Sequence, residues 1–309
     1  MRTVLIGAVG STRVVLEAMR AAGHPPSLLA TFDPVLGPKR HADYEDLSVL
    51  VGPETRVLHV DNVNEPATLA RIWDEGADAV FVVGWSQIVG PELRAAARRW
   101  CVGFHPSPLP SMRGRAVLGW TIALGLEESG STLFAIDGGV DTGAILAQAR
   151  YPVDARETVA SLGTKAIGAL GDMVRELLPR LMDGTAEAVP QAETGASYCA
   201  RRTAADQLID WSRPAIEVDR LIRASGRPYS GAFTFTRKRR VTVWRAEPIA
   251  RPERWHAFDG QVVSYLDGAP VVRCGDGGLL ALTEYETDEP GKPLTGQVRL
   301  RSRPGEEWE

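Results

Sequence analysis

Short apolar runs alternate with helix-like segments over the first half of the chain. The runs predict strands over residues 4–6, 27–32, 57–60, 79–83, 102–104 and 132–136. The stretches between them predict helices over residues 12–22, 66–75, 91–98 and 116–126. Strands that are apolar on both faces and separated by helices predict an α/β, Rossmann-like fold, in which a mostly parallel sheet carries helices on both faces. Such sheets place their sites at the carboxyl ends of the strands.

A change of pattern divides the chain into two domains. A long helix is expected over residues 157–182, and the polar segment that follows it shows no periodicity. We therefore predict a first domain over residues 1–190, a linker over 191–204 and a C-terminal domain over 205–309.

The C-terminal domain is predicted to be smaller and rich in β-structure. A capped helix is expected over residues 213–224. Short strands divided by glycine-containing turns then predict a small OB-like barrel. These strands cover residues 241–244, 262–265, 270–273 and 279–282.

The composition excludes several classes of protein. The net charge is −4 and the only dense basic group is Arg237–Arg240, so nucleic acid is not expected as a partner. The three cysteines, Cys101, Cys199 and Cys274, are far apart, which indicates reduced cytoplasmic thiols and no metal site. No apolar run approaches the roughly 18 residues of a membrane span, so no membrane partner is expected. A homodimer is left open.

His105 and Asp141 are the strongest candidates for chemistry. Each follows a strand-like apolar run and opens into a turn rich in proline or glycine. A histidine and a carboxylate at adjacent strand ends indicate proton transfer. The alternatives are a structural histidine and a turn-forming aspartate. An Asp-Thr-Gly turn, here residues 141–143, also occurs in aspartic proteases, but only one is present and the strand–helix alternation does not fit that fold.

A glycine-containing turn, residues 7–11, follows the first predicted strand. Its Gly-x-x-Gly spacing does not match the fingerprint of dinucleotide-binding proteins. We expect one of two roles. Ser11 caps the next helix, or the backbone amides near Gly10 and Ser11 bind a substrate phosphate.

Two longer motifs contain the candidate residues. They read His105-Pro-Ser-Pro-Leu-Pro-Ser-Met-Arg-Gly114 and Asp137-Gly-Gly-Val-Asp-Thr-Gly143. Both resemble signatures of the formyltransferases that use 10-formyltetrahydrofolate, Asn-x-His-Pro-Ser-x-Leu-Pro-x-x-Arg-Gly and Asp-x-Gly-x-Asp-x-Gly. Three short sequence motifs resemble the C-terminal domain of the same family, at residues 209–211, 222–224 and 229–233. The resemblance covers most of the chain and is closest in wording to the sugar-amine branch.

This resemblance implies 10-formyltetrahydrofolate as the cofactor, tetrahydrofolate as a product, and His105, Asp141 and Ser107 as catalytic residues. In formyl transfer an amine attacks the formyl carbon, charge develops on the formyl oxygen, and a proton leaves the amine. His105 is expected to donate to the oxygen or accept a proton, and Asp141 to hold the amine and pair with His105. Ser107 is expected to bond His105, the formyl oxygen or a local carbonyl.

One position departs from the family signature. Gly103 stands where the family carries a catalytic asparagine that helps to hold the oxyanion. Because a developing charge needs a partner, we expect a water or another donor, with Ser107 the nearest hydroxyl, to take the place of the amide. On this reasoning Gly103→Asn is expected to be tolerated or mildly activating.

The resemblance also implies a folate pocket built from two loops. The residues expected to bind the cofactor are Val83, Gly84, Trp85, Ser86, Ile88, Ile136, Asp137, Gly138, Gly139 and Val140. A pterin needs a flat apolar slot edged by backbone donors and acceptors, and Trp85 and Ile88 are expected to supply its walls.

The acceptor is expected to be a primary amine of a small molecule, most readily a nucleotide-linked amino sugar. Arg113 and Arg115 follow the histidine motif, where they either bind an anionic substrate or cap the next helix. Methionyl-tRNA is the first alternative, but residues 37–47 form a short segment with three acidic and two basic residues, where tRNA-acting relatives carry a basic insertion. Other small amines, a formyltetrahydrofolate hydrolase and a non-catalytic folate-binding protein are further alternatives.

Overall fold

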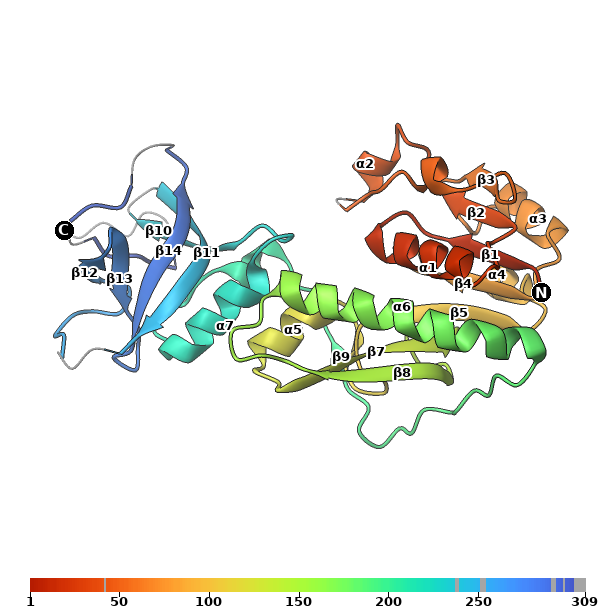
Figure 1. The fold of residues 1–309 in the computed structure, drawn as a ribbon. Coiled ribbons are helices and arrows are strands. Elements are labelled where there is room, and N and C mark those ends of the chain that lie inside the picture. Colours follow the sequence, from red (N-terminus) through yellow and green to blue (C-terminus); the bar gives the residue numbers. More distant parts are fainter. Residues whose placement is uncertain (42, 237–238, 251–253, 290–292, 297, 303–309) are drawn as a thin grey trace. The chain divides into compact units, whose positions relative to one another are not determined.

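The chain divides into two units, each built from several segments (Figure 1). The first unit comprises Met1–Gly114, Ser129–Tyr151 and Thr164–Tyr198, and the second comprises Arg115–Glu128, Pro152–Gly163 and Cys199–Glu309. The computed structural model describes residues 1–41, 43–236, 239–250, 254–289, 293–296 and 298–302.

A seven-stranded sheet organises the first unit, in the order β3-β2-β1-β4-β5-β7-β8. Its strands are β1 (Thr3–Ile6), β2 (Leu28–Thr31), β3 (Arg56–His59), β4 (Ala79–Val82), β5 (Trp100–His105), β7 (Glu128–Ala135) and β8 (Ile145–Pro152). The first five strands are parallel, and β7 is antiparallel to β5. The strand order reverses between β1 and β4, where sheets of this kind bind ligands beyond the carboxyl ends of their strands.

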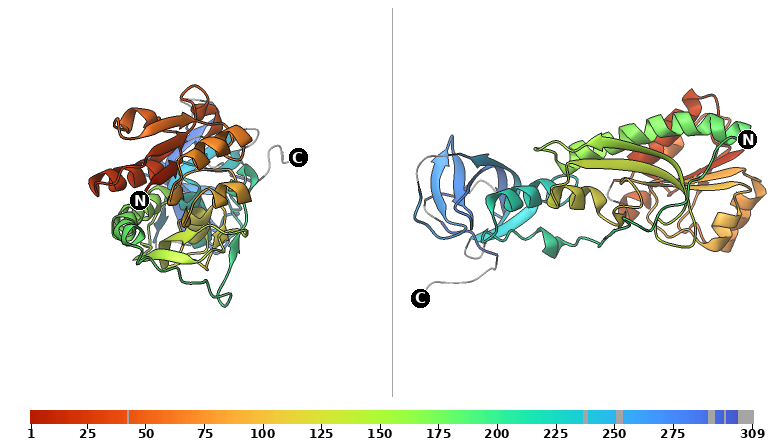
Figure 2. Two further views of the ribbon diagram at one scale, coloured as in Figure 1. Left: turned by 90° about the vertical axis from the view of Figure 1, so that its right-hand side faces the viewer. Right: turned by 90° about the horizontal axis from the view of Figure 1, so that it is seen from below.

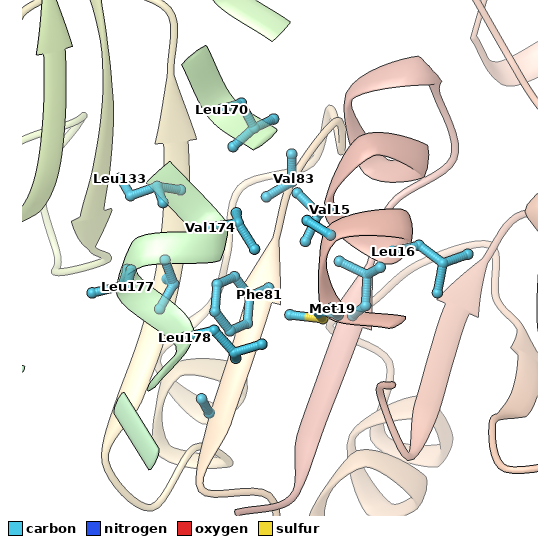
Figure 3. Packing of buried hydrophobic residues seen from close by; sticks show 14 of the residues in the cluster. Val15, Leu16, Met19, Phe81, Val83, Leu133, Leu170, Val174, Leu177 and Leu178 are labelled. Atoms are coloured by element: carbon cyan, nitrogen blue, oxygen red, sulfur yellow. The ribbon is translucent and has the colours of Figure 1, made fainter. Parts of the chain in front are cut away.

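Helices cover both faces of this sheet. Alternate strand residues point to opposite faces, so Phe81 joins one apolar cluster while its neighbours Val80 and Val82 join another. The Phe81 cluster includes side chains of α1 (Gly10–Ala21) and α6 (Val159–Asp183), which Figure 3 shows interlocking beside the sheet. The opposite cluster includes side chains of α3 (Pro66–Asp74) and α4 (Pro91–Ala95). The predicted Rossmann-like architecture is confirmed.

Several short elements and one long strand were not predicted from the sequence. The helix α2 (Gly37–Arg40) and the 3-10 helix η1 (Leu47–Leu50) are each only four residues long. The strand β8 shows mixed exposure along its length, so it lacks the continuous apolar run that marks the central strands.

The predicted linker, residues 191–204, is not a free tether. It contributes β9 (Tyr198–Cys199), which pairs with β6 (Arg113–Gly114) in a two-stranded sheet. The backbone N–H of Arg113 donates to the carbonyl of Ser197 at 2.8 Å. The segment up to Tyr198 belongs to the first unit.

The second unit contains a five-stranded antiparallel sheet in the order β10-β11-β14-β13-β12, which curls around on itself (Figure 2). Its elements are α5 (Val117–Ala123), η2 (Ala204–Gln207), α7 (Ala215–Ser225), β10 (Ala232–Thr236), β11 (Arg239–Ile249), β12 (Val262–Leu266), β13 (Ala269–Arg273) and β14 (Leu279–Thr287). Arg301 pairs with Phe235 on β10, and Arg299 pairs with Gln261 just before β12. One segment thus bridges the two edge strands, in agreement with the predicted β-rich domain.

Half of the basic group at 237–240 lies outside the described residues. Of its described members, Arg240 lies over the ring of Phe233 at 4.1 Å from the centroid. In the part of the chain that the structure describes, no helix is both long and apolar enough to cross a membrane.

Candidate functional site

His105 is the last residue of β5 and is buried, with 5% of its surface exposed. Its Nε2 lies 2.8 Å from the carbonyl oxygen of Met112. A carbonyl can only accept, so Nε2 carries the proton and Nδ1 is the nitrogen free to act as a base. The imidazole is therefore held in one tautomer and one orientation before any ligand binds.

Asp141 faces the other nitrogen of the histidine ring. Its Oδ2 lies 3.5 Å from His105 Nδ1 and accepts a hydrogen bond of 2.8 Å from the backbone N–H of Gly114. Both side chains are shielded from solvent: counted over side-chain atoms alone, 7% of His105 and 20% of Asp141 is exposed. A protonated His105 would donate from Nδ1 to this carboxylate, so the pair can hold and exchange one proton.

The two residues do not meet because their strands end at the same edge. The strand β7 runs antiparallel to β5, and its last residue, Ala135, lies opposite Val102 rather than His105. The turn that follows must double back to bring Asp141 to the histidine. Only glycine fits where the turn returns, because a Cβ on Gly143 would lie 1.6 Å from the carbonyl oxygen of Ala135.

Local hydrogen bonds shape the turn that carries Asp141. The Oδ1 of Asp137 accepts from the N–H of Gly139 at 3.0 Å and from the hydroxyl of Thr142 at 2.7 Å. Asp141 itself has a φ of 54°, in the left-handed region that aspartate tolerates better than most residues. The spacing of aspartates and glycines in this motif therefore encodes a specific turn.

Neighbouring strands hold the turn after His105. The hydroxyl of Thr132 donates to the carbonyl of Ser107 at 2.7 Å and accepts from the N–H of Leu109 at 3.2 Å. The side-chain amide of Gln148 donates to the carbonyl of Leu109 at 2.8 Å. The histidine turn is thus tied to β7 and β8.

The hydroxyl of Ser107 makes no hydrogen bond to His105 among the described interactions. Its hydroxyl donates to the carbonyl of Ser111 at 2.7 Å, within the same turn. Of the roles that the sequence left open for Ser107, the local carbonyl is the one observed. The hydroxyl is committed to the turn, which leaves the predicted catalytic role without geometric support.

The space beside Gly103 is already filled, contrary to the expectation of room for a water. A Cβ on Gly103 would lie 2.9 Å from the side chains of both Ile136 and Phe134. Phe134 is the cross-strand partner of Gly103 and is buried. Apolar side chains therefore lie where a side chain on residue 103 would begin, so Gly103→Asn requires Phe134 or Ile136 to move.

We now expect Gly103→Asn to lower the free energy of unfolding by about 1–3 kcal/mol, the usual cost of overpacking a core. The matched control is Gly138→Asn, because a Cβ on Gly138 meets nothing within 4 Å. Urea denaturation of both variants checks the difference. Equal stabilities would show that Phe134 and Ile136 move aside readily.

The first predicted folate loop follows β4. Val83 is buried, and its carbonyl accepts from the hydroxyl of Thr12 at 2.6 Å. Gly84 has a φ of 68°, which favours glycine. Ser86 is exposed and Ile88 is 81% exposed.

Trp85, predicted to be a wall of the folate pocket, is partly buried. Its ring stacks on Phe32 with a centroid separation of 4.1 Å, and its Nε1 donates to Gln87 at 3.2 Å. One face of the indole is therefore covered by protein. Trp85 and Ile136 pack against the same apolar cluster, so the structure brings the two predicted folate loops to one region.

The second predicted folate loop is more open. Asp137, Gly138, Gly139 and Val140 are all exposed, and Val140 has 60% of its surface accessible. Ile136 is half-buried. The folate assignments of both loops remain predictions.

Gly10 and Ser11 begin helix α1, but Ser11 does not cap it. The N-cap is Val9, whose N–H donates to the hydroxyl of Thr12 at 3.3 Å. Thr12, not Ser11, thus supplies the local hydrogen bond, and the predicted cap is wrong. The phosphate-binding role of Gly10 and Ser11 remains a prediction.

Arg113 is fully buried and does not face a substrate. Its guanidinium donates to Gln191 Oε1 at 2.9 and 3.1 Å and to the hydroxyl of Tyr198 at 2.8 Å, and it pairs with Glu193 at 3.2 Å. The predicted anion-binding role is therefore replaced by an internal one. Arg115 is exposed and belongs to the second unit.

Gln191 is the residue of this site that sequence reasoning missed. Its side-chain amide donates to the carbonyls of Asp141 and Gly143 at 2.8 and 2.7 Å. Val189, two residues earlier, pairs with Ile145 at the start of β8, which places Gln191 beside the Asp141 turn. No periodicity marks such a residue, because its partners lie about fifty positions away in the chain.

Two of the three cysteines are buried. Burial raises the pKa of the thiols of Cys101 and Cys274 to about 12, so neither is a thiolate nucleophile at neutral pH. Among the residues that the structure describes, no three histidine, cysteine or acidic side chains gather where they could hold a metal ion.

Comparison with known families identifies the class of this chain. A model described as formyl transferase matches residues 20–171, and one described as formyl transferase, C-terminal domain, matches residues 202–303. Together they cover both halves of the sequence in the expected order. The chain belongs to the formyltransferase family.

Solved structures of this class share the fold. The sugar 3N-formyltransferase WlaRD, determined in the presence of dTDP and 5-N-formyl-THF, is 16% identical with a TM-score of 0.67, covering 95% of this chain and 99% of that one. An N-formyltransferase from Helicobacter canadensis, in complex with folinic acid and dTDP-3-aminofucose, is 16% identical with a TM-score of 0.66. The match covers 91% of this chain and 98% of that one. Methionyl-tRNA formyltransferase from Clostridium thermocellum is 17% identical with a TM-score of 0.57. The match covers 80% of this chain and 93% of that one.

Proposed function

We propose that this protein transfers the formyl group of 10-formyltetrahydrofolate to the primary amine of a small substrate. The observation that carries the proposal is the shielded pair of His105 and Asp141, whose facing atoms are 3.5 Å apart. An acid–base pair held in one orientation is what acyl transfer to an amine requires. The family membership and the folate ligands named for related structures support the same donor.

Asp141 and His105 divide the work on the amine. The Oδ2 of Asp141 is occupied by Gly114 and faces His105, whereas Oδ1 has no hydrogen-bond partner among the described residues. Oδ1 is thus available to hold the incoming amine and take its proton. His105 Nδ1 lies beside the same carboxylate, where it stabilises the charge or receives the proton in turn.

The formyl oxygen needs a hydrogen-bond donor, and His105 is the donor that we propose. Its Nε2–H is bonded to the carbonyl of Met112, so it reaches the oxygen only by exchanging that carbonyl for the substrate. Hydrogen bonds of this kind are often rearranged when substrate binds. Gly103 has no side-chain amide, and the hydroxyl of Ser107 donates to the carbonyl of Ser111.

The residues present fit a folate donor at the level of shape. Ile88 and Val140 expose aliphatic surface on the two loops, which a flat ring can cover, and exposed backbone at Gly138 and Gly139 is open to a ligand. The donor would supply the formyl group itself. The chain supplies the surface that positions it and the pair that moves the proton.

A nucleotide-linked amino sugar is the proposed acceptor. The sequence motifs resemble those of the sugar-amine branch, and two of the similar structures were solved with dTDP or a dTDP-sugar. Against tRNA, the short segment over residues 37–47 is not strongly basic, and its Arg40 pairs with Asp61 at 2.5 Å.

Mass spectrometry tests the proposal directly. The protein is incubated with 10-formyltetrahydrofolate and a pool of primary amines that includes nucleotide-linked amino sugars, and we expect one of them to gain the mass of one formyl group. A parallel reaction contains charged initiator tRNA. We expect acceptor affinity to change little with salt, whereas a tRNA acceptor would give a steep fall of log affinity against log salt. Efficient, salt-sensitive formylation of tRNA would contradict the small-molecule acceptor.

The packing at Gly103 favours a second candidate, a folate-binding protein without turnover. Phe134 and Ile136 occupy the place of the amide that the family uses to hold the oxyanion. Calorimetric binding of a folate analogue, with no formyl transfer to any amine and no release of formate, would support this reading. Release of tetrahydrofolate that depends on an amine would exclude it.

A further inference from the structure

We propose that Gln191 is a positioning residue, which holds Asp141 in register with His105 and is itself oriented by Arg113. This inference rests on the proposed function, because it assigns a role in the same site. Gln191 lies in the segment that the sequence suggested was a linker, and it contacts neither His105 nor the carboxylate of Asp141 directly in the hydrogen bonds described above.

The amide of Gln191 clamps both ends of the last part of the Asp141 turn. Its Nε2 donates to the carbonyl of Asp141 at 2.8 Å and to the carbonyl of Gly143 at 2.7 Å. Asp141 has a φ of 54°, a conformation that is unfavourable for residues with a side chain. An amide that donates both to the carbonyl of Asp141 and to the carbonyl of Gly143 stabilises this backbone conformation relative to conformations with negative φ.

Arg113 determines which way the amide points. Its Nε and Nη2 donate to Gln191 Oε1 at 3.1 and 2.9 Å. A guanidinium can only donate and a backbone carbonyl can only accept, so the oxygen must face Arg113 and the nitrogen must face the turn. If the amide were flipped, its NH₂ group would face the N–H groups of Arg113 and its oxygen would face the two backbone carbonyls, so none of these hydrogen bonds would form.

The burial of Arg113 makes this arrangement stiff. The guanidinium is fully buried, and its other contacts are Tyr198 and Glu193. The backbone of the next residue, Gly114, donates to the carboxylate of Asp141 at 2.8 Å. One segment therefore holds Asp141 from two sides, its carboxylate through Gly114 and its carbonyl through Arg113 and Gln191.

The sharpest test is Gln191→Glu, which keeps the size of the side chain and the bond to Arg113 but cannot donate to the two carbonyls. We expect kcat for formyl transfer to fall at least about 10-fold, with KM for the donor changed much less, because displacing a catalytic group by 1 Å can cost about 10²-fold. If circular dichroism shows this variant to be unfolded, Gln191→Met replaces it, since methionine removes the donor without adding charge.

Glu193 provides the matched control. It pairs with the same guanidinium but is 78% exposed and makes no bond to the turn in the described interactions. We expect Glu193→Gln to leave kcat unchanged. The double variant Gln191→Glu/Glu193→Gln restores the net charge around Arg113, and we expect it to be as slow as Gln191→Glu alone. Recovery of kcat in the double variant would overturn the positioning role in favour of a charge effect.

A measurement without substrate separates this inference from the proposed function. The ¹⁵N resonance of His105 Nδ1 reports its contact with Asp141, and we expect it to move in Gln191→Glu but not in Glu193→Gln at the same pH. If the unsubstituted protein transfers no formyl group but the His105 resonance still moves in Gln191→Glu, the proposed function is refuted and the positioning role stands. An unchanged resonance in folded Gln191→Glu, whether or not kcat falls, would refute the positioning role.

Discussion

Replacing His105 by alanine is expected to lower kcat for formyl transfer by on the order of 10²-fold or more, the usual contribution of a positioned acid, base or oxyanion donor. Asp141→Asn is expected to have a loss of similar size. Its amide oxygen can still accept from Gly114, but an amide cannot take a proton from the amine. Steady-state kinetics with the acceptor found by mass spectrometry measures both effects.

Folate binding should be nearly unchanged in both variants, because these side chains serve the developing charges and not the ring of the donor. Calorimetry with a folate analogue checks this. The matched controls are His24→Ala, outside the site, and Asp172→Asn on the exposed face of α6, and both should retain wild-type turnover. Near-normal kcat in His105→Ala or Asp141→Asn would remove that residue from the mechanism.

The second large effect is on stability, at a buried cluster in the second unit. Asp219 is 1% exposed and pairs with Arg223 and Arg156, each at 2.8 Å. Arg223 is 8% exposed and also donates to the carbonyl of Glu157 at 2.7 Å. Asp219→Ala leaves the Arg223 charge buried without its carboxylate, and we expect the free energy of unfolding to fall by about 3–5 kcal/mol.

Urea denaturation followed by tryptophan fluorescence measures this loss, since Trp211 lies in the core of the same unit. The control is Asp172→Ala, which breaks the exposed pair of Asp172 and Arg175 and should cost about 0–1 kcal/mol. A loss below about 1 kcal/mol in Asp219→Ala would mean that water reaches Arg223 once the carboxylate is gone.

Local patterns in the sequence predicted the alternating parallel strands and helices of the first unit. Strands buried on both faces are continuously apolar, and helices between them keep a period of 3.6, so both signals lie within a few residues of one another. The strand β8 was missed for the complementary reason. It lies at the edge of the sheet with mixed exposure, and its sequence therefore carries no continuous apolar run.

By itself the sequence determined the alternation of strands and helices, the β-rich second domain, and the two motifs that contain His105 and Asp141. Only the tertiary structure decided what surrounds them. It closed the space beside Gly103 with Phe134 and turned Arg113 inward onto Gln191. The physical reason is range: propensity and motif spacing act between near neighbours, whereas steric exclusion and side-chain hydrogen bonds join residues separated by thirty to eighty positions.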